Sequence, residues 1–539
     1  MPKIVTTHVV RSDQVAHYLR PRDDLVVERD DGDQQFSLVS GPFDRYHRSV
    51  TLAAGPGVDQ VGVTETVSYH LAIPVWRPLF ALPVRGLLRQ PHHPADADDE
   101  PTGRGPRPWW APPDHFDARV SVGLSLMCVF AVLSGYLGAL LSQTNTYFRQ
   151  DFGATNGAVG LMLAATRVGA LLALVIVALA DRRGRRWVLI LSAVAGCALT
   201  ATGALAPDLV WLGISQTVAR AFSAALTLVI SIMAVEEMPA GSRAFAVSVL
   251  TATAALGAGI CVMLLKVADL GSGAWRILYV VPLPAIPVSI WLGRRLPETE
   301  RFERHQRVVH HPATTRRLEG WRTALASMDR GRLLLLSVSG FLLALFVLPA
   351  SSFLNDYLRT DRGFSTQAVI AFQILTNTPG GVGIVVGGRL ADQRGRRIIG
   401  SIGIAAGTFF TVLMFVTSGP QIWVWSLLGT VIGAIAVPAL AVYGPELFPT
   451  ESRGLANGLI NLFAVLGSAT GLALAGWLAD RAGGLGTAMV VLAVGPVVVV
   501  ALILLLFPET AARELEDINP LDRLEAVEAA GPDPPPAAT

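Results

Sequence analysis

Twelve long apolar segments between residues 119 and 507 restrict what this chain can fold into. Each segment reaches the length of about 20 residues that an α-helix needs to cross a bilayer. The apolar runs are continuous and do not alternate with polar residues, which favours helices over strands. The predicted spans are 120–143, 156–180, 187–206, 209–235, 244–266, 275–293, 333–355, 366–388, 398–417, 420–445, 454–479 and 484–507.

The composition agrees with a membrane protein. Charged residues make up 16% of the chain and hydrophobic residues 52%, whereas soluble domains carry about 25% charged residues. The net charge of +2 gives no signal for a nucleic-acid partner. Cys128, Cys197 and Cys261 each lie inside an apolar run, so we interpret them as small core residues rather than disulfides, metal ligands or nucleophiles.

The orientation follows from basic residues in the loops. Arginines gather in the loops after even-numbered spans, above all in the long loop 294–332. The positive-inside rule makes that side cytoplasmic, and both termini with it, in the cytoplasmic (inner) membrane. The first residues lack an apolar stretch, so we expect no cleavable signal peptide.

The long loop divides the spans into six plus six and so organises the chain. The first 118 residues are polar and mixed, and short strand patterns fall at 25–28, 35–39, 49–52 and 61–71. An apolar segment with spaced arginines, 76–89, is too short to span and is typical of an interfacial helix. We predict a β-rich N-terminal cytoplasmic region 1–89, a Pro- and Asp-rich linker 90–118, bundles 119–293 and 333–507, a cytoplasmic central loop 294–332 and a disordered tail 508–539.

Three motifs recur at nearly one offset, and each falls at the same place in its half. Duplicated halves are typical of transporters, whose solute site lies at the interface between the halves near mid-membrane. The repeats pair Ala180–Arg186 with Ala391–Arg397, Glu236–Arg243 with Glu446–Arg453, and Pro297–Thr299 with Pro508–Thr510.

Residues 388–397, Gly-Arg-Leu-Ala-Asp-Gln-Arg-Gly-Arg-Arg, match the loop signature of the major facilitator superfamily, which the chain resembles over about 119–510. The first copy departs from the signature, with Val177 in place of the leading glycine. The resemblance implies an all-α membrane fold of twelve helices in two six-helix bundles, beside the small strand-containing N-terminal region. Trp275-Arg276 and the two Pro-Glu-Thr motifs resemble the sugar-porter and metabolite-symporter branches. Residues 255–259 lack the Gly-Pro pair of the drug-antiporter branch.

The repeated charges at the cytoplasmic ends of the helices have two interpretations. In the superfamily such charges bridge neighbouring helices when the cytoplasmic side is closed, so the resemblance implies a gate. The alternative is charge that only sets topology, with exposed pairs worth under about 1 kcal/mol each. The gate residues implied are Asp181, Arg185, Glu236, Arg243, Asp392, Arg396, Glu446 and Arg453.

Two arginines lie inside predicted spans. Arg167 precedes Asp181 by about 21 Å of helix and Arg220 precedes Glu236 by about 24 Å, which places both near the middle or in the outer half of their spans. A mid-span arginine costs roughly 2.5–3.5 kcal/mol on insertion scales, so each should face the protein interior or a wet cavity. The pair predicts a positive cavity for an anionic solute; the alternative is a structural role against backbone carbonyls or neighbouring helices.

Other polar side chains in the spans are candidates for the same cavity, although any one of them also suits helix–helix contact. These substrate-cavity candidates are Tyr136, Gln143, Gln373, Asn377 and Asn461.

The sequence thus predicts a monomeric transporter that moves a small polar solute, an organic anion or a sugar-like metabolite, through the lipid bilayer by alternating access. It shows no catalytic constellation, so we expect no enzyme, cofactor or metal site. The alternatives are a drug/proton antiporter and, from another class, a membrane sensor that uses the N-terminal domain.

Overall fold

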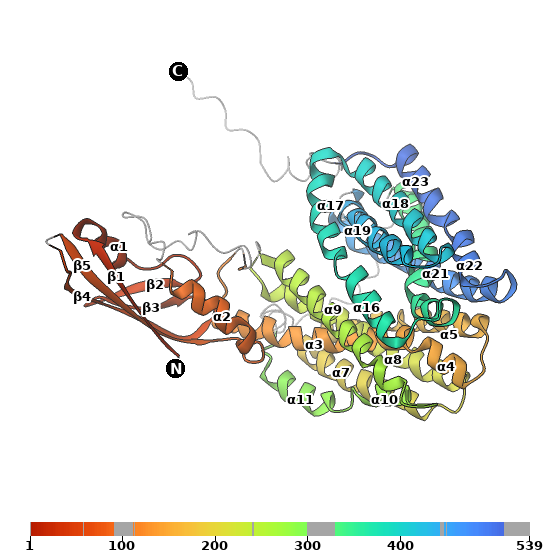
Figure 1. Ribbon diagram of the computed structural model, residues 1–539, viewed down its shortest axis with the longest axis horizontal. Coiled ribbons are helices and arrows are strands. Elements are labelled where there is room, and N and C mark those ends of the chain that lie inside the picture. The colour runs from red at the N-terminus through yellow and green to blue at the C-terminus, as the bar shows by residue number, and fades with distance from the viewer. Residues whose placement is uncertain are drawn as a thin grey trace, which may run out of the picture.

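The computed structural model describes residues 2–57, 59–90, 111–112, 114–239, 242–298, 329–441, 443, 447–448 and 450–510, without the side chains of 181, 182, 244, 392 and 450–454. In these ranges, 12 helices are long and apolar enough to cross a membrane. Most of the predicted linker, most of the central loop and the predicted tail beyond residue 510 lie outside the described residues. Figure 1 shows the helical part beside a small sheet formed by the N-terminal residues.

The twelve predicted spans are confirmed, and their ends shift by a few residues. Four of them are interrupted and consist of two helices each. In chain order the spans are α3 (Ala118–Gln143), α5–α6 (Asn156–Gly169 and Leu172–Arg183), α7 (Arg185–Thr202), α8 (Leu209–Glu237), α9 (Arg243–Ala268), α10–α11 (Arg276–Val280 and Ala285–Arg295), α14 (Arg330–Ser352), α16–α17 (Thr366–Asn377 and Gly380–Arg394), α18 (Arg396–Val416), α19 (Gln421–Ala441), α21 (Thr450–Arg481) and α22–α23 (Leu485–Leu492 and Val494–Leu506).

The spans form two six-helix halves, here called the N-half (α3–α11) and the C-half (α14–α23) (Figure 1). We call the end where α6 meets α7 and α17 meets α18 the basic end, since it carries the repeated arginines, and the opposite end the distal end. The halves pack on each other through α5 against α21 and α9 against α16. The basic-end helices α6 and α17 pack mainly on helices of their own half.

The interrupted spans occupy matching places in the two halves. The second span breaks between Gly169 and Leu172, and the eighth between Asn377 and Gly380, where Pro379 removes a backbone donor. Paired breaks at corresponding positions point to the solute site of a transporter. Arg167 lies in the last turn before the first of these breaks.

The glutamates of the repeated Pro-Glu-Thr motifs cap the N-terminus of the helix that follows each glycine turn. Gly184 and Gly395 have φ values of 99° and 96°, a conformation that favours glycine. The Glu298 carboxylate accepts from the backbone N–H groups of Arg185 at 2.9 Å and Arg186 at 3.2 Å. Glu509 accepts from Arg396 at 2.9 Å and Arg397 at 3.1 Å in the same way. Each glutamate therefore satisfies the otherwise unpaired donors of a helix N-terminus.

The N-terminal residues form an antiparallel sheet of five strands in the order β1-β5-β4-β3-β2. The first strand was missed by the sequence analysis, and the others begin or end a few residues from their predicted positions. A helix, α2 (Arg77–Leu88), follows the last strand, where an interfacial helix was predicted. The strands are β1 (Lys3–Arg11), β2 (Val27–Gly32), β3 (Gln35–Ser40), β4 (Phe43–Ala54) and β5 (Gln60–Leu71).

An ion network is buried in this sheet domain. The Arg48 guanidinium is 0% exposed and lies 2.7 Å from the Glu28 carboxylate and 2.9 Å from Glu65. The Tyr46 hydroxyl donates to Glu28 at 2.7 Å. Burial and the Glu28 charge raise the pKa of Tyr46 well above its usual range, so the phenol remains a donor. Such a buried ion network contributes little net stability to the folded state. Removing one of its members is nevertheless costly, because the substitution leaves a buried charge without a partner.

Candidate functional site

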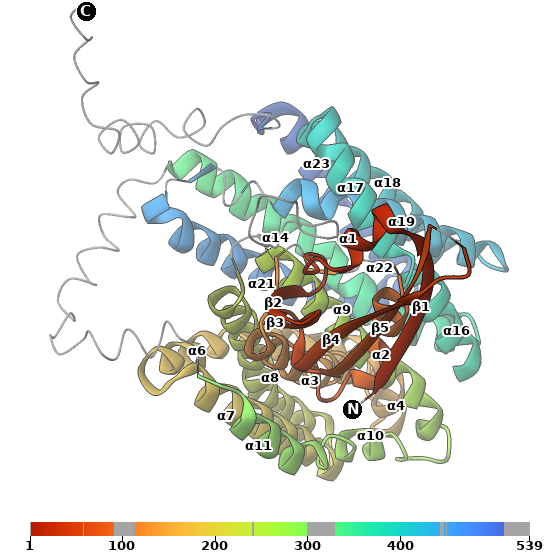
Figure 2. The same cartoon turned by 90° about the vertical axis from the view of Figure 1, so that its left-hand side faces the viewer.

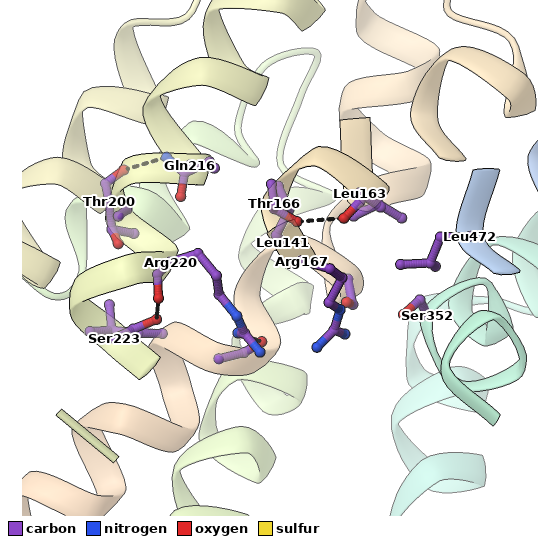
Figure 3. Close-up of a pocket in the computed structure, with 14 residues that line it drawn as sticks. Leu141, Leu163, Thr166, Arg167, Thr200, Gln216, Arg220, Ser223, Ser352 and Leu472 are labelled. Atoms are coloured by element: carbon purple, nitrogen blue, oxygen red, sulfur yellow. Dashed lines mark hydrogen bonds between the residues drawn. The ribbon is translucent and has the colours of Figure 1, made fainter. Parts of the chain in front are cut away.

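Arg167 and Arg220 share one pocket in the N-half. Figure 3 shows both guanidinium groups pointing into the same space, with Arg167 on α5 and Arg220 on α8. Arg220 donates to the Gly138 carbonyl of α3 at 2.9 Å. Arg167 makes no hydrogen bond or ion pair with the part of the chain that the structure describes, and both side chains are only half-buried. Among described residues the pocket lining includes no Asp or Glu.

Hydroxyl and amide groups complete this arginine pocket. The hydroxyls of Thr166 and Ser223 donate hydrogen bonds of 2.7 Å and 3.2 Å to backbone carbonyls of their own helices. Gln216 donates to the Thr200 carbonyl at 3.3 Å. Ser352 and Leu472 enter from the C-half. The pocket therefore has two positive groups, neutral polar neighbours and walls from both halves.

A larger cavity of about 690 Å³ opens in the C-half, within the range of about 300–1,000 Å³ typical of small-molecule sites. Gln143, Gln373 and Asn377 line it, as the sequence analysis expected of cavity residues. The rest of the lining is apolar or small, with hydroxyls at Ser351, Thr408, Thr411, Ser426 and Thr430.

Two amides join the halves at this cavity. The Gln143 and Gln373 side chains exchange hydrogen bonds of 3.1 Å and 3.0 Å. Asn355 donates in addition to the Gln143 carbonyl. Gln143 ends α3 of the N-half and Gln373 lies on α16 of the C-half, so these bonds cross between the halves.

Two predicted cavity residues lie elsewhere. The Tyr136 hydroxyl donates to the Leu278 carbonyl at 2.7 Å, and the side chain is buried in the core of the N-half. Asn461 is exposed on α21 and lines neither of these two cavities. The structure therefore groups Arg167 with Arg220, and Gln143 with Gln373 and Asn377, but leaves Tyr136 and Asn461 apart.

Two ion pairs connect the halves at the distal end. Arg149 of the N-half lies 3.0 Å from Asp356 of the C-half, whose side chain is 2% exposed. Arg359 of the C-half lies 3.2 Å from Asp269 of the N-half. We call these four residues the distal clasp. Tyr147 supports the second pair, because its hydroxyl donates to Asp269 at 3.1 Å.

A third contact between the halves lies beside the distal clasp. The Asp480 carboxylate of α21 accepts from the backbone N–H groups of Asn156 at 3.0 Å and Gly157 at 2.7 Å, at the start of α5. A Cβ atom on Gly476 would overlap the Asn156 carbonyl, and one on Gly160 would overlap Leu472. Glycine is thus required for this close approach of α5 and α21.

The basic end shows charge contacts within each half. Arg185 lies 3.2 Å from Glu236, and both belong to the N-half. The Arg396 guanidinium donates to the Thr510 hydroxyl at 2.9 Å in the C-half. Arg243 begins α9 and is half-buried. The other predicted gate residues lie outside the described residues or side chains, namely Asp181, Asp392, Glu446 and Arg453.

The superfamily follows from this architecture and from a family model. Two six-helix halves meet around a central polar site, and the model of the Major Facilitator Superfamily matches residues 122–427 and 369–520. The chain belongs to the Major Facilitator Superfamily. It is therefore a multi-pass membrane transporter of small solutes, as the loop signature at 388–397 had indicated.

Similar proteins support the same assignment. The cis,cis-muconate transport protein of Acinetobacter baylyi is 22% identical over 316 residues, 58% of this chain and 76% of that protein. A bacterial homologue of the human lysosomal transporter Spinster, inward-facing and unoccupied, is 16% identical with a TM-score of 0.60 over 72% of this chain and 96% of that one. The inward-open xylose transporter XylE of E. coli is 18% identical with a TM-score of 0.59 over 75% and 99%.

The distal clasp was missed by the sequence analysis. None of its four residues is among the cavity or gate candidates that the sequence analysis names. Arg149 and Asp356 are 207 positions apart. The same loops carry other acids and arginines, among them Asp151, Arg276, Asp361 and Arg362, so the sequence does not single out the four residues of the clasp.

Replacing Gly476 by valine should prevent the distal end from closing, because the new side chain would overlap Asn156 on α5. We expect loss of transport and longer distances between spin labels at Leu205→Cys and Ser418→Cys, which lie at the distal ends of the two halves. The matched control is Gly458→Val on the same helix, where a Cβ meets open space. Unchanged label distances in Gly476→Val would contradict this prediction.

Proposed function

We propose that this transporter moves a small organic anion across the cytoplasmic membrane by alternating access. The observation that carries the proposal is the pocket shared by Arg167 and Arg220, in which no carboxylate balances the two charges among the described residues. Guanidinium groups bind carboxylates and phosphates through two parallel hydrogen bonds. An arginine without an acidic partner is costly in a span, so its presence there favours a function in binding.

The two cavities suggest how such a solute would be held. Its anionic group would pair with Arg167, while Arg220 remains on the Gly138 carbonyl. Its less polar part would extend toward the C-half cavity, whose lining combines apolar side chains with hydroxyls. The similarity to a muconate transport protein supports this class, because muconate is itself a carboxylate anion.

The sides of the membrane follow from the basic residues. The positive-inside rule assigns the basic end, with both chain termini, to the cytoplasm. The distal clasp and the α5–α21 contact then close the outer side, so the conformation is inward-facing. The inward-facing Spinster homologue and XylE structures, which have the same fold, are consistent with that assignment.

The gate at the basic end would form in the opposite conformation. Asp181, Asp392, Glu446 and Arg453 belong to this gate in our proposal, together with Arg185, Glu236, Arg243 and Arg396. The Arg185–Glu236 ion pair already exists within the N-half. Closing of the basic end would bring this pair into contact with the C-half. Contacts that differ between two states are what make a gate bistable.

A neutral sugar-like solute is the second candidate. The amides of Gln143, Gln373 and Asn377 and the hydroxyls of the C-half cavity are suited to hydroxyl groups, and the chain shares its fold with a xylose transporter. Symport with an ion, drug/proton antiport and a sensor role for the N-terminal domain have no comparable geometric support. We propose further that the transporter acts as a monomer without cofactor or metal.

Thermal stability of the purified transporter separates the two candidates. A ligand at 100 times its Kd stabilises the folded state by about 2.7 kcal/mol. We expect a rise in Tm with organic dicarboxylates such as muconate and no rise with xylose. A rise with xylose alone would overturn the anion proposal and make Arg167 and Arg220 structural residues.

A further inference from the structure

The outer face of helix α2 is apolar and uncovered. Its inner face packs on the sheet through Val84 and Leu88, each 2% exposed. On the opposite face Leu79 is 67% exposed and Leu82 77% exposed, and Val75 just before the helix is 45% exposed. Residues 75, 79 and 82 follow helical spacing, so their side chains form one strip.

Two arginines border this apolar strip. Arg85 and Arg89 are exposed and lie one turn apart, Arg85 beside the strip and Arg89 at its C-terminal end, seven residues after Leu82. An apolar strip bordered by basic residues is the pattern of helices that lie in the interface of an anionic membrane. Figure 2 shows α2 close to α3, the first span of the N-half.

A tryptophan fixes the depth of α2 along the first span. The Trp76 indole donates to the Ser125 carbonyl of α3 at 3.0 Å. Ser125 lies seven residues from the start of α3, about 10 Å along its axis. The 26 residues of α3 extend about 39 Å, compared with about 30 Å of hydrocarbon, so Ser125 lies just inside the hydrocarbon boundary. Trp76 is therefore at the depth where membrane proteins place interfacial tryptophans.

The sheet domain is also held to the N-half near the start of α3. Ser40 donates to the Asp117 carboxylate at 2.9 Å, and His115 lies 2.7 Å from the Asp24 carbonyl. The Asp114 backbone N–H donates to Ser242 at 2.8 Å. The first two bonds hold the sheet domain at the basic end of the N-half, and the third holds the segment before α3 to the start of α9.

We propose that α2 lies in the bilayer interface at the basic end, with Val75, Leu79 and Leu82 among the acyl chains and Arg85 and Arg89 against anionic headgroups. The occupant of this face is the lipid surface itself, because Trp76 sets the strip at interface depth and the arginines complement anionic lipid. The helix would anchor the sheet domain to the membrane together with the N-half.

The test places a fluorophore on the strip of the full-length protein. The three native cysteines, Cys128, Cys197 and Cys261, are replaced by alanine, and Leu82→Cys is introduced and labelled with the fluorophore. The labelled protein is reconstituted as single molecules in nanodiscs of phosphatidylcholine and phosphatidylglycerol. We expect quenching by lipids with shallow nitroxide groups and weak quenching by aqueous iodide. The matched control is Asp33→Cys in the exposed β2–β3 turn, which should show the reverse. Iodide quenching at position 82 without lipid quenching would overturn the proposal.

The two arginines provide a second and independent readout. With phosphatidylcholine alone, or with Arg85→Gln and Arg89→Gln combined, lipid quenching at position 82 should fall at least twofold. Quenching that does not depend on lipid charge would contradict the role of the arginines. Protection of the fluorophore only at high protein concentration in detergent would assign the strip to a second copy of the chain and overturn the lipid proposal.

Discussion

Arg167→Gln should lower kcat/KM for organic-anion transport by about 10- to 100-fold, because a charge-assisted hydrogen bond is worth about 1.5–3 kcal/mol. Arg167 has no partner among the described residues, so the substitution removes no internal contact that the structure shows there. The folded state should therefore keep its Tm or gain stability, since a mid-span charge is removed. Initial uptake rates in proteoliposomes and Tm in detergent measure the two effects.

Two further variants make the Arg167 result interpretable. Arg330→Gln removes an exposed arginine at the start of α14, away from both cavities, and should leave uptake unchanged. Arg167→Lys keeps the charge but loses the planar pair of donors, so its rate should fall between those of wild type and Arg167→Gln. Anion uptake by Arg167→Gln at the wild-type rate would show that Arg167 does not bind the solute.

Asp356→Asn should shift the transporter toward the conformation with an open distal end. The substitution leaves Arg149 without its anionic partner between the halves. Removing one partner of a buried ion pair costs about 3 kcal/mol or more, which changes the ratio of the two conformations by about 100-fold or more. Because the Arg149–Asp356 pair joins the two halves, its loss destabilises the conformation with a closed distal end relative to the one with an open distal end. Distances between labels at Leu205→Cys and Ser418→Cys report the shift.

An ion pair within one half supplies the control. Asp151 and Arg276 lie 2.6 Å apart at the same end, but both belong to the N-half. Asp151→Asn should therefore lower stability slightly and leave the label distances unchanged. Combining Arg149→Gln with Asp356→Asn should add little to the effect of either substitution alone. Equal shifts in Asp151→Asn and Asp356→Asn would show that the effect is general destabilisation of the distal end.

The spans could be predicted because length and continuous hydrophobicity determine a transmembrane helix almost alone. The strand β1 was missed although Lys3–Arg11 carries the pattern of a strand, with Ile4 buried and Val5 and Val9 exposed. Its pairing with β5 joins segments about 60 residues apart, and the short run was judged only as a candidate signal sequence.

The candidate site was partly predictable for a similar reason. A charge inside an apolar span stands out, so Arg167 and Arg220 could be identified from sequence, and the structure brings them together. Tyr136 could not be excluded, because the sequence of α3 does not show which face meets Leu278. The distal clasp depends on how the two halves are placed against each other. No local sequence pattern shows which residues of one half will face which residues of the other.

Solute uptake in proteoliposomes tests the central claim most directly. The wild-type transporter and Arg167→Gln would be compared on labelled muconate and labelled xylose, with empty liposomes as background. The account predicts saturable uptake of muconate by the wild type, a much slower rate in Arg167→Gln and no uptake of xylose above background. Saturable xylose uptake that is equal in the two proteins, with no uptake of muconate, would contradict it.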